Sequence, residues 1–209
     1  MPGELEVRSA QDLLVSPLEG VAWLVEELIT TGLVVLAGTP KVGKSWFCLC
    51  LGLCVSLGTT FLDHATECAD VLYLCLEDQY GRIQSRLFHL VDVANDNLRF
   101  AIMADKLNSG LILQLEKYLE TYPRTKLIIV DTLQKVRVAS GDSAYAADYQ
   151  DVGLLKSFAD KHGICVLLVH HTRKMGDDAN IFNTISGSNG IIGAADECLM
   201  LTKDAMFDD

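Results

Sequence analysis

The sequence has few basic residues, no long apolar run and no feature of a secretion signal. Its 209 residues include 17 Lys and Arg against 28 Asp and Glu, which gives a formal net charge of −11. This charge argues against a broad basic surface for nucleic acid, but it does not exclude a local contact by a few Arg and Lys residues. The longest apolar runs have the length of a strand, so none could span a membrane as a helix. The first six residues carry no basic side chain, and we expect a cytoplasmic protein.

The seven cysteines also lack a recognisable pattern. No C-x-x-C pair occurs among them, and no Cys and His cluster has the spacing of zinc ligands. Cys75 and Cys165 lie inside apolar runs, and Cys50 and Cys54 share one face of a predicted helix. We therefore expect no zinc site, and buried reduced thiols that pack as small hydrophobic side chains.

The most informative feature that is present is segment 38–45, which reads GTPKVGKS and fits the phosphate-loop pattern G-x-x-x-x-G-K-[ST]. The apolar run 33–37 before it predicts a buried strand, and the apolar run that begins at Ser45 predicts a helix. Strand, loop and helix in this order are the context that the motif requires. The alternative is a glycine-rich turn that binds nothing. The residues expected to bind a nucleoside triphosphate are Gly38, Thr39, Pro40, Lys41, Val42, Gly43, Lys44 and Ser45.

Each residue type in this loop suits phosphate chemistry. Gly38 and Gly43 permit a backbone with positive φ that approaches a phosphate closely. Inward-pointing N–H groups, with a helix N-terminus behind them, attract an anion. Lys44 is expected to act in catalysis by reaching the β- and γ-phosphates, and Ser45 to place its hydroxyl on Mg²⁺.

Two further apolar runs end in carboxylates. Run 127–130 is followed by Asp131, the Walker B pattern, which predicts a partner for the loop serine or for a water bound to Mg²⁺. Run 71–76 is followed by Glu77 and Asp78. A carboxylate at this edge can orient the attacking water and accept its proton, and we assign this role to Glu77, with Asp78 in reserve. Asp78 has an alternative role as the N-cap of the next helix.

A third apolar run, 164–169, ends in His170 and His171. Consecutive strand residues face opposite sides of a sheet, so we expect only one of these candidate catalytic residues to meet the nucleotide, and the sequence leaves open which. A neutral imidazole there could hydrogen-bond the γ-phosphate and signal its loss to the following loop. The alternative is a purely structural pair.

Strands and helices alternate along the chain. Predicted strands are 33–37, 71–76, 126–131, 164–170 and 197–201, with a short extra strand at 99–103, and predicted helices are 44–57, 79–93, 109–120 and 144–161. The strand runs are continuously apolar, which indicates burial on both faces of a sheet. The expected fold is α/β, with a mostly parallel sheet and helices on both faces. Residues 1–30 are expected to form a lead-in with a short helix at 10–15, and residues 31–209 one core.

Taken together, these motifs resemble the AAA_25 group of RecA-like P-loop ATPases, which includes the plasmid RepA hexameric replicative helicase. The segments that carry the resemblance are Trp23 with 33–37, then 38–46, 71–78, 127–132 and 170–174. The resemblance implies a core strand order of 5-1-4-3-2, with ATP and Mg²⁺ bound at the phosphate loop. It implies that Glu77 is the catalytic base and that His170 and His171 lie next to the γ-phosphate.

The resemblance also adds side chains to the expected nucleotide site. Trp46 ends the loop segment that matches the group. Arg82 and Arg86 match a basic pattern that is common in the group, where such residues contact the nucleotide or a neighbouring subunit, and we include Arg86 among the nucleotide contacts. The alternative for both arginines is solvated helix charge.

The implied partners are other copies of the chain and single-stranded DNA. In such proteins ATP lies between the subunits of a ring, here expected to be hexameric, and channel loops contact the DNA. The matching loops are 134–148 and 172–190, with Arg137, Arg173 and Lys174 as phosphate contacts. Relatives continue beyond the equivalent of Asp209 with strands that carry basic residues, so we expect a core that is truncated at its C-terminus or that lacks the arginine acting across the interface.

The expected function is an ATP-binding, Mg²⁺-dependent, ATP-hydrolysing motor domain of a replicative-helicase-like protein that acts on DNA. Two alternatives stay open. One is a RecA-like ATPase of recombination or regulation that does not unwind DNA. The other is a nucleotide-binding module with negligible turnover.

Overall fold

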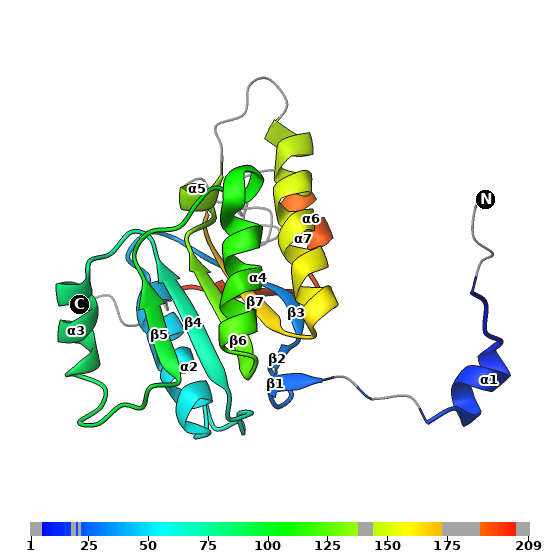
Figure 1. Cartoon of the computed structure of the whole chain (residues 1–209), viewed down its shortest axis with the longest axis horizontal. Coiled ribbons are helices and arrows are strands. Elements are labelled where there is room, and N and C mark those ends of the chain that lie inside the picture. The colour runs from blue at the N-terminus through cyan, green and yellow to red at the C-terminus, as the bar shows by residue number, and fades with distance from the viewer. Residues whose placement is uncertain (1–5, 18–19, 21, 138–143, 173–188, 204–209) are drawn as a thin grey trace.

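The computed structural model describes residues 6–17, 20, 22–137, 144–172 and 189–203. Its centre is a six-stranded sheet between two layers of helices (Figure 1). The strands are β3 (Gly32–Gly38), β4 (Asp70–Cys75), β5 (Leu98–Ala101), β6 (Thr125–Asp131), β7 (Cys165–His171) and β8 (Glu197–Leu201). Each described pair of neighbouring strands in this sheet is parallel. The predicted α/β class with a parallel sheet is confirmed.

The order of the strands is β5-β4-β6-β7-β3-β8. Without β5 it reads β8-β3-β7-β6-β4, which is the expected core order 5-1-4-3-2. The short extra strand expected at 99–103 is β5, and it extends the sheet at its edge, next to β4. This order places the phosphate-loop strand β3 directly beside β7, the strand that ends in the two histidines.

Helices cover both faces of the sheet. They are α2 (Lys44–Leu57), α3 (Tyr80–Leu87), α4 (Ile112–Thr121), α5 (Leu133–Val136), α6 (Ala144–His162) and α7 (Asn189–Ala194), and a π-helical turn, η1 (Leu107–Leu111), precedes α4. One apolar core joins the sheet to α2 and α3, and a second joins it to α4, α5, α6 and α7. The helix expected at 109–120 begins later because Gly110 has φ +141° and breaks the helical backbone. Among the described residues, no helix has the length and apolar character needed to cross a membrane.

Alternation along the strands decides which side chains face α2. In β4, Val71, Tyr73 and Cys75 belong to the core on the α2 side, whereas Leu72 and Leu74 belong to the other core. All six residues of the strand are buried. The same alternation in β7 separates His171 from His170, because consecutive side chains point to opposite faces.

The expected lead-in contains more structure than the sequence suggested. The helix expected at 10–15 is α1 (Ala10–Val15), which has no buried side chain and lies apart from the sheet in Figure 1. Strands β1 (Trp23–Val25) and β2 (Ile29–Thr30) form a small antiparallel sheet. Leu24, Val25 and Ile29 are fully buried in the core on the α2 side. The end of the lead-in therefore packs with the core, while the boundary at residue 30 stays a prediction.

Gly32, at the start of β3, gives a testable prediction about stability. Its φ is +108°, and a Cβ atom there would lie 2.5 Å from Oδ2 of Asp196. That carboxylate accepts hydrogen bonds from the Leu33 N–H and from Lys156, so it cannot move away freely. We expect Gly32→Ala to destabilise the fold by about 1–3 kcal/mol. Thermal unfolding should show a fall of roughly 2–4 °C for each kcal/mol.

Gly153 is the matched control for this change. It lies within α6, and a Cβ atom there would meet nothing within 4 Å. Gly153→Ala is expected to raise stability by up to about 1 kcal/mol, because alanine favours a helix over glycine. Equal unfolding temperatures for the two variants would contradict the explanation given for Gly32.

Candidate functional site

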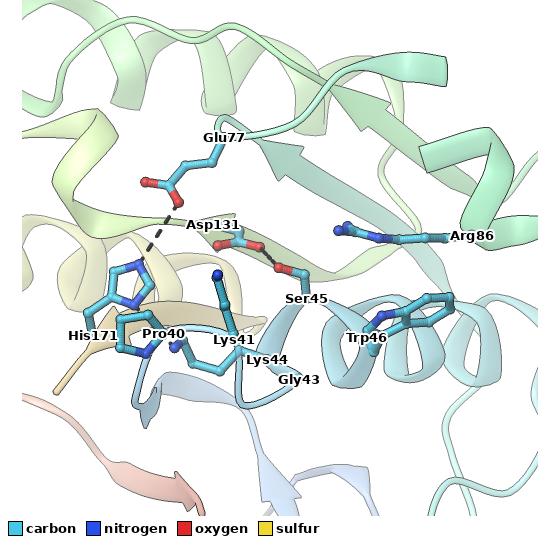
Figure 2. A pocket seen from close by; sticks show the side chains of 10 residues that line it. All are labelled: Pro40, Lys41, Gly43, Lys44, Ser45, Trp46, Glu77, Arg86, Asp131 and His171. Atoms are coloured by element: carbon cyan, nitrogen blue, oxygen red, sulfur yellow. Dashed lines mark hydrogen bonds and ion pairs between the residues drawn. The ribbon is translucent and has the colours of Figure 1, made fainter. Parts of the chain in front are cut away.

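A cavity of about 530 Å³ lies where the phosphate loop meets the carboxyl ends of the central strands. Its volume is in the range of small-molecule sites, and its position at the carboxyl edge of a parallel sheet is where α/β proteins bind ligands. Figure 2 shows the side chains that line it, which are Pro40, Lys41, Gly43, Lys44, Ser45, Trp46, Glu77, Arg86, Asp131 and His171. The cavity thus brings together the loop, both strand-end carboxylates and one histidine.

The two loop positions Gly38 and Gly43 require glycine for different reasons. Gly43 has φ +108° and is the N-cap of α2, without a side-chain hydrogen bond on the helix end. The first N–H groups of α2 are therefore free of a side-chain cap at the cavity. Positive φ was expected at Gly38 as well, but Gly38 is not among the positive-φ residues of the described chain. A glycine is required there because a Cβ atom would lie 2.6 Å from the carbonyl oxygen of Leu201 in β8.

Lys44 lies in the loop with its ammonium group bonded on three sides. Nζ donates to the carbonyl oxygens of Gly38 and Thr39, at 2.7 and 2.9 Å, and lies 3.2 Å from Nδ1 of His171. An ammonium group can only donate, so Nδ1 accepts and the ring proton of His171 is on Nε2. Burial lowers the pKa of Lys44, and the charges of Asp131 and Glu77 partly offset this effect.

Ser45 and Asp131 form the part of the site that suits a metal. Ser45 Oγ donates to Asp131 Oδ2 at 2.9 Å, and Tyr73 Oη, from β4, donates to the same oxygen at 3.0 Å. Burial raises the pKa of Asp131, and these two hydrogen bonds partly oppose the rise. Tyr73 was missed by the sequence reasoning. The available signal was a hydroxyl four residues before Glu77 in an otherwise apolar strand.

The donor set fits Mg²⁺. A hydroxyl and a carboxylate lie side by side at the loop, and Mg²⁺ prefers one or two such oxygens together with waters and substrate phosphates. Within the ranges that the structure describes, no group of three or more His, Cys, Asp and Glu could enclose a metal ion. Ser45 and Asp131 are therefore suited to a metal that arrives with a phosphate ligand.

Glu77 follows β4 and points across the cavity toward His171 (Figure 2). Its Oε1 accepts a hydrogen bond from Thr132 Oγ1 at 3.3 Å, and its Oε2 lies 3.9 Å from His171 Nε2. Thr132 is 1% exposed, so one carboxylate oxygen of Glu77 has a buried anchor. The other oxygen lies at the cavity, within reach of a small molecule.

The structure distinguishes the two histidines. His171 lines the cavity, whereas His170 is 1% exposed, on the opposite face of β7, and does not line it. Of the side chains expected to contact DNA, Arg173 and Lys174 lie outside the described residues, as do 138–143 and the rest of 173–188. Arg137 is described, and its Nε lies 3.1 Å from Asp151.

Arg86 extends from α3 over Trp46, with its guanidinium carbon 5.6 Å from the ring centre. Its Nη1 pairs with Asp78 Oδ2 at 2.6 Å, and Arg82 pairs with the other oxygen of Asp78 at 3.3 Å. Arg86 reaches the cavity, whereas Arg82 is largely exposed. Asp78 is therefore held in ion pairs. It is not the N-cap of α3, because that helix begins at Tyr80 and its N-cap is Gln79.

The fold and the loop define the class of protein as a RecA-like α/β domain with a phosphate loop. The chain belongs to the AAA_25 family, described as an AAA domain, whose profile matches residues 2–177. No curated protein matches the sequence.

Solved structures with a similar fold include two that are related to helicases or ATPases by their descriptions. One is the ATPase domain of G40P, with a TM-score of 0.65 and 16% sequence identity over 85% of this chain and 72% of that chain. The other is a DnaB-like replicative helicase, described with its interactions with primase, with a TM-score of 0.65 and 16% identity over 85% of this chain. This chain covers 48% of that helicase chain. At this identity the likeness establishes the fold.

Proposed function

We propose that this chain binds ATP and Mg²⁺ in the cavity and hydrolyses the γ-phosphate, as the motor domain of a replicative-helicase-like protein that acts on DNA in the cytoplasm. The observation that carries the proposal is the meeting of Lys44, Ser45, Asp131, Glu77 and His171 around one cavity at the phosphate loop. Family membership and the helicase-like fold support the same function.

ATP is bound through its phosphates. The N–H groups at the start of α2 and the ammonium group of Lys44 supply positive potential at the loop. The ammonium group of Lys44 donates to the carbonyl oxygens of Gly38 and Thr39, and these two hydrogen bonds hold it beside the proposed phosphate site. Beside the loop, Trp46 and Arg86 line the same cavity, with the guanidinium group over the ring, and we assign them to contacts with the rest of the nucleotide.

Glu77 is the proposed general base. It orients the attacking water and accepts its proton through Oε2, while Thr132 holds Oε1. His171 carries its proton on Nε2 when Lys44 donates to Nδ1, so it can donate to the γ-phosphate and change partner when that phosphate leaves. Bound at Ser45 and Asp131, Mg²⁺ supplies charge neutralisation for the phosphates.

The proposed partners are further copies of the chain, in a hexameric ring, and single-stranded DNA at loops 134–148 and 172–190. One of the similar structures is a DnaB-like replicative helicase, and this chain covers about half of that helicase chain. Unwinding is thus proposed for the assembled protein, and nucleotide binding for this domain alone.

The experiment that tests the proposal measures ATP binding by calorimetry and phosphate release by a coupled assay, with Mg²⁺ and with excess EDTA. We expect binding and slow turnover that single-stranded DNA increases at high protein concentration, and loss of turnover with EDTA. Failure to bind ATP would overturn the proposal. Binding without phosphate release, even with DNA, would instead support a nucleotide-binding module.

A further inference from the structure

The hydroxyl of Tyr73 lies at the floor of the candidate site, outside the set of residues that line the main cavity. Tyr73 is 3% exposed, and its ring packs against Phe100 of the edge strand, with ring centres 5.9 Å apart. A smaller polar cavity of about 140 Å³ lies beside the main one, and Tyr73, Ser45, Glu77 and Asp131 are among its lining residues. The hydroxyl thus reaches the metal-binding part of the site from within the sheet.

We propose that Tyr73 is a positioning residue that fixes the Asp131 carboxylate for Mg²⁺ binding, an inference that rests on the proposed function. Both described hydrogen bonds of this carboxylate go to Oδ2, one from Ser45 at 2.9 Å and one from Tyr73 at 3.0 Å. Two donors on one oxygen fix the plane of the carboxylate and leave Oδ1 with its full capacity to accept from a metal-bound water.

The two donors differ in rigidity. Ser45 belongs to the loop itself and is a proposed metal ligand, whereas Tyr73 is held inside β4 by burial on both faces of the sheet. Strand β4 pairs with β6 through Cys75 and Asp131, so the tyrosine donates across neighbouring strands whose register is fixed. Tyr73 can therefore hold Asp131 independently of the loop.

The surroundings keep the Tyr73 hydroxyl a donor. Burial raises the pKa of Tyr73 well above its usual range, and burial likewise raises the pKa of the Cys48 and Cys75 thiols near it. The acceptor that the structure gives this hydroxyl is Oδ2 of the Asp131 carboxylate, at 3.0 Å. A hydrogen bond to a charged acceptor is the strong kind, and losing it in a buried site has a measurable effect.

The test is Tyr73→Phe, which removes one oxygen atom. ADP binding is measured at increasing Mg²⁺ concentrations by the fluorescence of Trp46, which lines the cavity. All variants carry Trp23→Phe, so that Trp46 is the sole tryptophan. We expect Mg²⁺-free ADP affinity within about twofold of wild type, and on the order of a tenfold rise in the Mg²⁺ concentration at half-saturation. ATP turnover should recover to within about threefold at saturating Mg²⁺.

Tyr118→Phe is the matched control, because it makes the same chemical change in α4, beside Arg99 and away from the cavity. It should leave the Mg²⁺ dependence as in wild type. In an Asp131→Asn background, Tyr73→Phe should change the Mg²⁺ concentration at half-saturation by less than about twofold, because the tyrosine acts through that carboxylate.

Three outcomes overturn the inference. They are an unchanged Mg²⁺ dependence in Tyr73→Phe, a full additional effect in the Asp131→Asn background, and a fall in Mg²⁺-free ADP affinity, which would indicate a general loss of structure. These outcomes differ from failure of the proposed function, in which the wild-type protein itself would bind no nucleotide.

Discussion

Replacing Glu77 by glutamine is expected to slow ATP turnover by roughly 10²–10⁴-fold, the usual contribution of a general base, while ATP affinity stays within about threefold. Glutamine has the same shape and can still accept the hydrogen bond from Thr132, but it cannot take the proton of the attacking water. Glu77 lies on the far side of the cavity from the phosphate loop, so binding of the phosphates depends little on it (Figure 2).

Single-turnover phosphate release, measured beside ATP binding by calorimetry, separates these two effects. Asp78→Asn is the matched control, since it changes the neighbouring carboxylate, which is held by Arg82 and Arg86. We expect it to slow turnover by less than about tenfold, because Asp78 does not line the cavity at the phosphate loop and an asparagine can still accept hydrogen bonds from both arginines. Equal losses in the two variants would contradict the assignment of Glu77 as the base.

Lys44→Ala is expected to lower turnover by roughly 10²–10³-fold and to weaken ATP binding, because it removes a charge aimed at the phosphates. Lys44 is 5% exposed, and its ammonium group is held by two loop carbonyls and by His171. The loss should appear in affinity as well as in rate, in contrast to Glu77→Gln.

Lys41→Ala is the control for this variant. Lys41 belongs to the same loop and also lines the cavity, but it is exposed. Both changes remove one positive charge from the loop. A much smaller loss of turnover in Lys41→Ala would therefore show that the effect of Lys44→Ala depends on the position of the charge and not on net charge. Thermal unfolding of both variants checks that the fold is retained, and similar losses of turnover would argue against the role given to Lys44.

The histidine pair shows where sequence reasoning reached its limit. The sequence indicated that only one of the two residues faces the nucleotide, because consecutive strand side chains alternate. The choice depends on which residues of β7 face α2, and this follows from the packing of the whole sheet. The structure brings His171 to the cavity and buries His170 on the other face.

The hairpin in the lead-in is a second case. The segment that contains Leu24 and Ile29 is short and has no clear period, so it predicted neither a strand nor burial. In the structure both side chains are fully buried against the core on the α2 side. A strand of two or three residues gains its stability from packing with distant parts of the chain, and such packing leaves little trace in a local pattern.

The phosphate loop and the parallel sheet were within reach of the sequence because their causes are local or topological, whereas the strand order was implied by the resemblance to the AAA_25 group. A loop of eight consecutive residues sets its own backbone, and apolar strands that alternate with helices give a parallel sheet whose carboxyl ends meet at one edge. Only the tertiary structure decided that His171 contacts Lys44, that Gly38 is required by Leu201, and that Tyr73 donates to Asp131. These contacts join residues far apart in the chain, and they depend on strand register and on the packing of both sheet faces.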